Sequence, residues 1–326
     1  MTMCDAHAGK PVPHMRELLE GLPKNWGRWG ENDEVGALNF LDAAEVLRGV
    51  ASVKSGKTFT LQVQMGHPKG DPVWPGRAGA QRFNIMDKGD FLCGAGKESP
   101  GNHEFADDVM IMYLQGSTQY DALGHVWYDD HIYNGYDAKT TAGSLKKASV
   151  LPIAERGIVG RGILIDMARH RGKEVLDKGE TFDHRDLMEA ARAQGCEIAK
   201  HDILLIRTGW IGSYYRREKE EFYADFIEPG LTFSRELVEW FHEMELVNLV
   251  TDTIANEVTA DPETGVVIPL HCALMRNLGV TFTEITALDT LAQDCATDGQ
   301  WTFLYTAAPL KVVGGSGAPV NPVVIK

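Results

Sequence analysis

Apolar and polar positions follow two different periods along the chain, so both helices and strands are expected. Helical spacing of apolar residues covers 41–53, 182–194 and 235–244. Thr181 or Asp183 can cap the second of these helices, Gly195 can end it, and Ser234 can cap the third. Strand-like runs occupy residues 58–64, 109–114, 162–167, 202–208 and 246–251. The pattern predicts an α/β protein whose apolar runs, including 109–114, are buried strands.

The last third of the chain gives shorter signals. Residues 271–277 are expected to form a short helix that Gly279 closes in a left-handed conformation. A strand is expected over 280–283, and Glu284 is expected to begin an apolar helix that reaches Leu291. The glycines of 157–162 resemble a dinucleotide-binding fingerprint, but their spacing is wrong and a strand follows them. We therefore expect a tight turn at 157–162.

Two segments show neither the helical nor the strand period of apolar residues. Residues 66–106 are rich in Gly, Pro and Asp, which is typical of a functional lid or a poorly ordered excursion. Residues 1–24 are polar, contain prolines, and are expected to run over the surface as an extended amino-terminal arm. The remaining pattern predicts one domain that spans residues 1–326.

Composition narrows the class of protein. Hydrophobic residues make up 44% of the chain and charged residues 24%, as in ordinary folded proteins. The net charge of -14 argues against a nucleic-acid or anionic-membrane surface, because both need clustered Lys and Arg. The five cysteines show no CxxC spacing, and no apolar run suggests a signal peptide or a membrane span. A cytoplasmic enzyme that acts on a small molecule is expected.

Candidate chemistry begins directly after the run at 109–114. Gln115, Gln119, Asp121 and His125 follow at spacings of four, two and four, with glycine and small residues between them. A metal ion is the simplest object that would gather these side chains. A turn in which Asp121 bonds nearby backbone N–H groups would use the same residues. His271 and Glu284 are also open to two interpretations, because each could simply stabilise a helix end.

As a metal site, the set would combine oxygen and imidazole ligands without thiolate, which suits Zn²⁺ or Mn²⁺. Asp121, His271 and Glu284 would supply two negative charges and one imidazole, and an open position would remain for water. Gln115 and Gln119 can offer only neutral amide oxygens or orient other groups. His125 would be a further ligand or a proton shuttle.

The spacing Q-x3-Q-x-D-x3-H, followed far downstream by His271 and Glu284, resembles the cyclase family of metal-dependent hydrolases. That family includes kynurenine formamidase and isatin hydrolase, which carry H-x3-H-x-D-x3-H, and the glutamine version resembles its trans-dienelactone hydrolase branch. The likeness extends over most of the chain, through the segments 25–30, 160–166, 205–210 and 251–253.

The resemblance implies a swivelling β/β/α fold, with a mixed sheet or barrel-like β core flanked by helices. It also implies a divalent metal, hydrolysis of a lactone, cyclic amide or formamide, and a homo-oligomer (dimer or tetramer). Asp121, Glu284 and His125 would carry the catalysis. Because amide oxygens bind zinc less well than imidazole does, we expect one metal on Asp121, His271 and Glu284, with Gln119, His125 or Gln115 contributing.

Substrate-binding candidates are aromatic or cationic. Trp26 and Trp29 would wall a pocket or cap the core edge, and Arg77, Arg82 or Arg207 would hold a substrate carboxylate, although Arg207 could equally form a structural ion pair. Three other functions remain open: a metal-poor relative that binds a small aromatic or polyketide-like ligand without catalysis, an arylformamidase-type amide hydrolase, and an iron oxygenase with a 2-His-1-carboxylate set.

Overall fold

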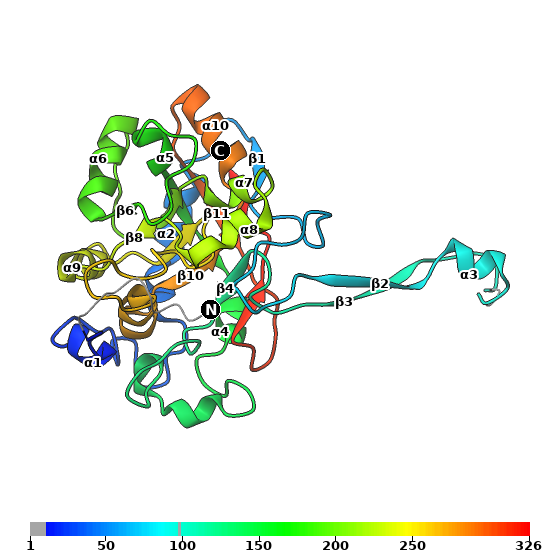
Figure 1. Cartoon of the computed structure of the whole chain (residues 1–326), viewed down its shortest axis with the longest axis horizontal. Helices are drawn as coiled ribbons and strands as arrows, with labels where there is room; N and C mark the ends of the chain where they lie inside the picture. Colours follow the sequence, from blue (N-terminus) through cyan, green and yellow to red (C-terminus); the bar gives the residue numbers. More distant parts are fainter. Residues whose placement is uncertain (1–10, 97–98) are drawn as a thin grey trace.

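A nine-stranded mixed sheet forms the centre of the molecule, which is described by a computed structural model over residues 11–96 and 99–326. The strand order is β1-β13-β11-β5-β7-β9-β10-β4-β12. The four strands β5, β7, β9 and β10 run parallel, and the remaining pairings are antiparallel. Helices pack around this curled sheet (Figure 1). The mixed sheet flanked by helices confirms the expected fold class.

The strands are β1 (Thr58–Thr60), β2 (Gln81–Met86), β3 (Asp107–Ile111), β4 (Gln119–Asp121), β5 (Ile158–Asp166), β6 (Thr181–Phe182), β7 (Ile203–Arg207), β8 (Gly230–Leu231), β9 (Asn248–Thr251), β10 (Thr281–Glu284), β11 (Thr302–Ala307), β12 (Gly317–Pro319) and β13 (Val323–Ile325). The helices are α1 (Met15–Leu18), α2 (Ala43–Val50), α3 (Lys88–Leu92), α4 (Val150–Arg156), α5 (Met167–His170), α6 (His184–Gln194), α7 (Trp210–Tyr214), α8 (Lys219–Tyr223), α9 (Arg235–Glu243) and α10 (Asp289–Asp298). Four short 3₁₀ turns are η1 (Gly36–Phe40), η2 (Tyr133–Gly135), η3 (Ala138–Thr141) and η4 (Ala224–Phe226), and η5 (His271–Leu278) is a π-helix.

Cap chemistry places the longer helices where the sequence predicts them. The Asp183 side chain accepts from two backbone N–H groups at the start of α6, and Gly195 ends that helix in the left-handed conformation. Ser234 caps α9 by accepting from the Leu237 N–H. The parallel strands β5 and β7 are apolar and almost wholly buried, since other elements cover both faces of the sheet.

Helix α2 lies very close to β5. A Cβ on Gly49 would come within 2.6 Å of the Gly160 carbonyl carbon, so neither backbone leaves room for a side chain at this crossing. The prediction of a tight turn at 157–162 is wrong except at Gly157, because β5 already begins at Ile158. The glycines allow close packing instead: a Cβ on Gly162 would lie 2.5 Å from the Phe303 ring.

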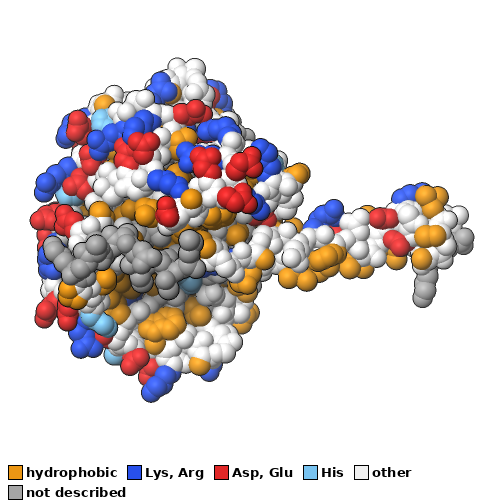
Figure 2. All heavy atoms as spheres, viewed as in Figure 1, with side chains coloured by type: hydrophobic (Ala, Val, Ile, Leu, Met, Phe, Trp, Pro, Cys, Tyr) orange, Lys and Arg blue, Asp and Glu red, His pale blue; other side chains and the backbone are white. Residues whose placement is uncertain are grey.

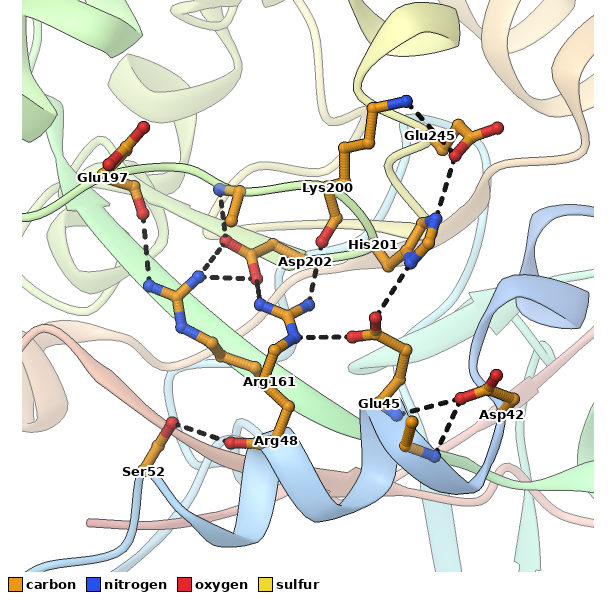
Figure 3. A network of polar contacts seen from close by, with 12 residues as sticks. Asp42, Glu45, Arg48, Ser52, Arg161, Glu197, Lys200, His201, Asp202 and Glu245 are labelled. Atoms are coloured by element: carbon orange, nitrogen blue, oxygen red, sulfur yellow. Dashed lines mark hydrogen bonds and ion pairs between the residues drawn. The ribbon is translucent and has the colours of Figure 1, made fainter.

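A polar network fastens α2 to the segment that precedes β7 (Figure 3). The buried Asp202 carboxylate accepts from Arg161 of β5 at 2.6 and 2.8 Å and from Arg48 of α2 at 2.8 Å. Burial raises the pKa of Asp202, although both guanidinium groups oppose the shift. The His201 ring bridges the Glu45 and Glu245 carboxylates at 3.0 Å each.

The Arg161→Leu substitution should therefore destabilise the fold by about 3 kcal/mol, because it removes two hydrogen bonds from a buried carboxylate. Urea unfolding followed by circular dichroism measures this difference. Arg171→Leu is the matched control: its partner Asp186 is partly exposed, so the expected loss is below about 1 kcal/mol. Equal losses in both variants would contradict a structural role for the Asp202 network.

The described residues of 81–111 (81–96 and 99–111) form an arm that projects from the body (Figure 1; Figure 2). Strands β2 and β3 pair as an antiparallel ribbon, and α3 lies beyond its outer end. The prediction that 109–114 forms a buried strand is wrong, because Val109, Met110 and Ile111 belong to this ribbon and are 42%, 39% and 62% exposed. The long excursion expected at 66–106 is present, but its outer part is this ribbon rather than an irregular lid.

The amino-terminal segment is only partly described, since residues 1–10 of the expected 1–24 arm lie outside the described residues. Within the described part, Leu19 and Leu22 are buried in the core, which anchors the chain before residue 24. No helix among the described residues is both long and apolar enough to cross a bilayer.

Candidate metal centre

Strand register brings three polar side chains to one face of the sheet. Gln119 of β4 pairs with Glu284 of β10, and Asp121 lies two residues further along β4. Directly opposed residues and residues two apart share a face, so the three side chains point the same way. All three are buried, with exposures of 3% or less. The chain builds this carboxylate pair from strands, not from the loop that the sequence predicts after 109–114.

His271 completes the group from the amino end of η5. One ligand atom from each of Asp121, His271 and Glu284 lies within 4.8 Å of the other two. The His271 Nε2 atom is 3.3 Å from Glu284 Oε1, and its Nδ1 is 2.7 Å from Glu257 Oε1. Because Nδ1–H is donated to Glu257, Nε2 faces Glu284 and the cluster and is the atom that could bind an ion there. The residues that the sequence predicts as neighbours therefore do converge.

Glu284 ends a strand, so the prediction that it begins a helix is wrong; the next helix, α10, starts at Asp289. The following residue, Ile285, has φ of 56°, a left-handed conformation that β-branched residues rarely adopt. The Ile285 N–H donates to Thr253 and its carbonyl accepts from Thr118, which together hold this conformation. Such strain costs on the order of 1–3 kcal/mol and is typical of functional sites.

Two buried acceptors in the cluster are unsatisfied. Asp121 Oδ1 and Gln119 Oε1 receive no hydrogen bond from the described residues, although both atoms are buried. Orphaned buried oxygens of this kind require a partner. Two carboxylates and an imidazole fit a divalent cation, so the residues present match the cofactor that the sequence implies.

The two glutamines already use their amide nitrogens. Gln119 Nε2 donates to Glu284 Oε2 at 2.7 Å, and Gln115 Nε2 donates to Ser316 Oγ at 3.0 Å. Gln119 therefore orients the Glu284 carboxylate and can still present its own oxygen, whereas Gln115 is held beside the site. A Cβ on Gly317 would lie 2.8 Å from Gln115 Nε2 and 3.2 Å from Asp121 Oδ1, so only glycine fits between these two side chains.

The electrostatics of the cluster favour an added positive charge. Burial, and then the neighbouring Asp121 charge, raise the pKa of Glu284 to about 7. Burial alone would lower the pKa of His271, but hydrogen bonds to Glu257 and Glu284 outweigh it and raise that pKa to about 10. A proton on His271 thus balances the carboxylates, which is the balance that a bound cation would supply.

His125 is partly buried and is close enough to Asp121 and His271 to interact with their charges, but it is not one of the three residues whose ligand atoms converge. Burial lowers the pKa of His125, although the Asp121 charge opposes the shift. At neutral pH its imidazole is therefore neutral and able to accept a proton.

The amino-terminal loop holds the other end of η5. Asn25 donates its side-chain amide to the Leu278 carbonyl, and the Trp26 indole N–H donates to the Arg276 carbonyl, each at 2.9 Å. The Trp26 ring also lies 4.6 Å from the Arg276 guanidinium. These contacts satisfy carbonyls at the end of the helix opposite His271. Trp26 thus has a structural role at the edge of the core. The sequence analysis considered this role as the alternative to a pocket wall.

A cavity of about 520 Å³ is lined by residues of 66–80 and of α7 and α8, and by none of the cluster residues. Its lining includes Trp74, Arg77, Tyr214, Lys219 and Tyr223. Arg77 also donates to the Gln115 carbonyl at 3.1 Å, and its charge lowers the pKa values of both Glu284 and His125. Arg77 therefore connects the cavity to the candidate metal ligands.

The described contacts of the other substrate-binding candidates do not include the cluster. Arg82 lies on the arm and pairs with Asp108 at 2.8 Å. Arg207 is held by Asp166 at 3.0 Å and Asp289 at 2.7 Å, which is the structural ion pair considered for it. The Trp29 ring packs edge-on against Phe40.

Sequence reasoning missed Glu257 and Asn256. Glu257 also accepts from the backbone N–H groups of Leu270 and His271, so it fixes both the imidazole and the start of η5. Asn256 donates to Glu284 Oε1 at 3.4 Å. Their one sequence signal is a carboxamide and a carboxylate within a threonine-rich stretch after a buried strand.

Comparison with known proteins agrees with the fold. The model of the Cyclase family, described as "Putative cyclase", matches residues 59–258. A crystal structure of a novel cyclase is 33% identical, with a TM-score of 0.85, and the alignment covers 97% of this chain and 100% of that one. None of the curated proteins compared with the chain matches it.

More distant structures share the fold alone. Isatin hydrolase A from Labrenzia aggregata, bound to benzyl benzoate, is 19% identical with a TM-score of 0.58, over 86% of this chain and 97% of that one. An isatin hydrolase bound to the product analogue thioisatinate is 18% identical with a TM-score of 0.56, over 88% and 97%. The family model and the 33% identical structure together define the class: the chain belongs to the cyclase family.

Proposed function

We propose that this protein is a metal-dependent hydrolase that opens a lactone or a related cyclic ester or amide. The observation that carries the proposal is the buried group of Asp121, His271 and Glu284, with an unsatisfied Asp121 oxygen. Arg77, which bonds the Gln115 carbonyl, relates this group to a cavity. A divalent cation bound there would polarise the substrate carbonyl and acidify water. One structure that shares the fold is an isatin hydrolase bound to the product analogue thioisatinate, which supports hydrolysis as the reaction class.

The residues of this chain have separate roles in the proposed reaction. His125 takes a proton from the attacking water and returns it to the leaving oxygen or nitrogen as the ring bond breaks. Hydrolysis thus adds one water, forms an acyl C–O bond and releases a hydroxy acid or amino acid product. Glu257 holds the imidazole of His271, and Gln119 orients Glu284. These two contacts fix the ligand geometry before substrate binds.

The same proposal includes the finer features that the resemblance implies. One imidazole with two carboxylates suits Zn²⁺ or Mn²⁺. Arg77 would pair with a substrate carboxylate, as a dienelactone carries, and Trp74 would pack on the unsaturated ring. We also propose a cytoplasmic homo-oligomer.

Metal content and a matched substrate panel test the proposal. We expect about one equivalent of Zn or Mn, and lactone opening that a chelator abolishes and either metal restores. Arg77→Gln should raise KM about tenfold or more for a lactone that bears a carboxylate, and should leave a neutral lactone nearly unchanged. Metal-replete protein that opens neither lactones nor cyclic amides nor aryl formamides would overturn the proposed reaction.

A second candidate is a metal-poor binding protein. The hydrogen bond between Gln119 and Glu284 favours it, because that amide satisfies part of a carboxylate that a metal would otherwise neutralise. Under about a tenth of an equivalent of metal after gentle purification, together with tight binding of an unreacted aromatic ligand, would select this function.

A further inference from the structure

A second, smaller hydrophobic core joins the wall of the cavity to the end of strand β10. Ile285 and Tyr214 are buried in this core, and Trp74 and Tyr223 pack against it. Tyr214, Trp74 and Tyr223 also line the cavity. Ile285, by contrast, directly follows Glu284, the candidate metal ligand that ends β10. The small core therefore has the cavity on one side and a metal ligand on the other.

One hydroxyl group bonds both sides of this core. Thr118 is fully buried, and its Oγ1 donates to the Ile285 carbonyl at 2.6 Å. The same oxygen accepts from the Val63 backbone N–H at 3.0 Å. Val63 is itself buried in the small core and lies just before Gly66, where the cavity lining begins. The side chain of Thr118 is thus donor and acceptor at once, which among side chains of this size is a property of Ser and Thr.

The bond to Ile285 matters because the backbone there is strained. Ile285 is left-handed at φ 56°, and a β-branched residue keeps this conformation only where its surroundings impose it. Two bonds from other segments do so: the Ile285 N–H donates to the Thr253 carbonyl at 2.9 Å, and the Ile285 carbonyl accepts from Thr118. Glu284 and Ile285 share a rigid peptide unit, so a rotation at Ile285 would also move Glu284.

The residue after Thr118 holds Glu284 from its other end. Gln119 donates its amide to Glu284 Oε2 at 2.7 Å, whereas Thr118 holds the main chain that follows Glu284. Two consecutive residues therefore fix both the carboxylate and the backbone of the same ligand. Contacts of this kind determine how well a ligand is oriented toward a metal.

We infer that Thr118 is a positioning residue for the metal site, and that its hydroxyl couples this site to the cavity. It keeps Ile285 left-handed, which sets the direction of the Glu284 carboxylate. It also holds Val63 at the start of the segment that lines the cavity. The inference rests on the proposed function, in which Glu284 binds the metal and the cavity receives the substrate.

The affinity of the full chain for Zn²⁺ tests the positioning role, measured by competition with a chromophoric chelator. Thr118→Val keeps the shape of the side chain but removes the hydroxyl, so its affinity should fall by about 10- to 100-fold. Thr118→Ser keeps the hydroxyl and should stay within about threefold of wild type. These measurements need no substrate.

Thr281→Val is the matched control. Thr281 is fully buried at the other end of the same strand, and its hydroxyl donates to the Val247 carbonyl at 3.1 Å. The substitution removes the same group from the same strand without touching Ile285, so affinity for Zn²⁺ should not change. A crystal structure of Thr118→Val should show Ile285 outside the left-handed region and Val63 displaced from its place in the small core.

The other outcomes overturn the inference. Unchanged affinity in Thr118→Val, an equal loss in Thr281→Val, or an Ile285 that stays left-handed would exclude the positioning role. A Val63 that keeps its place would exclude the link to the cavity. If circular dichroism shows that Thr118→Val is unfolded, Thr118→Cys replaces it, because a thiol of similar size forms only weak hydrogen bonds.

Failure of the proposed function gives a different result. A wild-type chain that binds Zn²⁺ but opens no lactone, cyclic amide or aryl formamide would overturn the reaction, while the comparison of affinities would still decide the role of Thr118. A wild-type chain that binds no metal would overturn both.

Discussion

Replacing His271 with alanine should reduce bound metal to less than about a tenth of an equivalent and lower kcat/KM for lactone opening by at least about 10³-fold. The reason is that His271 supplies the one imidazole of the cluster and also fixes Glu257, whose carboxylate would be left buried without its strongest partner. Elemental analysis and steady-state kinetics measure the two effects separately.

The neighbouring Cys272 gives the control for this variant. It is buried in the same helix, so Cys272→Ala should report any general damage to η5 while metal content stays unchanged. Asp121→Ala should behave like His271→Ala. Full metal content and full activity in both His271→Ala and Asp121→Ala would remove the basis of the metal-site assignment.

The second large effect is expected at His125. His125→Asn should lower kcat by about 10²–10⁴-fold while metal content and KM stay close to the wild-type values, if the residue moves protons as proposed and does not hold the ion. Burial lowers the pKa of His125 below its usual value, so its neutral, proton-accepting form prevails at neutral pH.

The pH profile gives this prediction its sign. Wild-type kcat/KM should fall as the pH decreases through the pKa of His125, because protonation removes the base. In His125→Asn the residual kcat/KM should be much lower and should no longer fall as the pH decreases through this range. Loss of metal from the variant would show that His125 is a ligand instead, and an unchanged kcat would exclude it from proton transfer.

The sequence predicted the parts of the fold that local chemistry determines. The caps of α6 and α9 and the apolar strands β5, β7 and β9 lie close to their predicted ranges, because cap residues and continuous apolar runs act over short distances. The proximity of Asp121, His271 and Glu284 was predicted from a family motif, since no local rule relates residues so far apart in the chain.

The errors have physical causes as well. An apolar run predicts that residues 109–111 are buried, but it does not show which element would bury them. Here these residues lie on the arm and are exposed. Glu284 is a residue type that favours a helix start, yet here it is the last residue of β10. The strand ends because the next residue, Ile285, is left-handed and is held so by the distant Thr118 and Thr253. Glu257 was missed because its function depends on a helix end that only the tertiary structure brings to it.

The attachment of Asn25 and Trp26 to the far end of η5 has a consequence for how the protein is assembled during synthesis. The imidazole of His271 is borne on a helix whose carbonyls are satisfied by residues made some two hundred and fifty positions earlier. Asn25 and Trp26 therefore cannot form these hydrogen bonds until nearly the whole polypeptide has been synthesised. Metal affinity should arise late, as a property of the completed chain and not of any fragment.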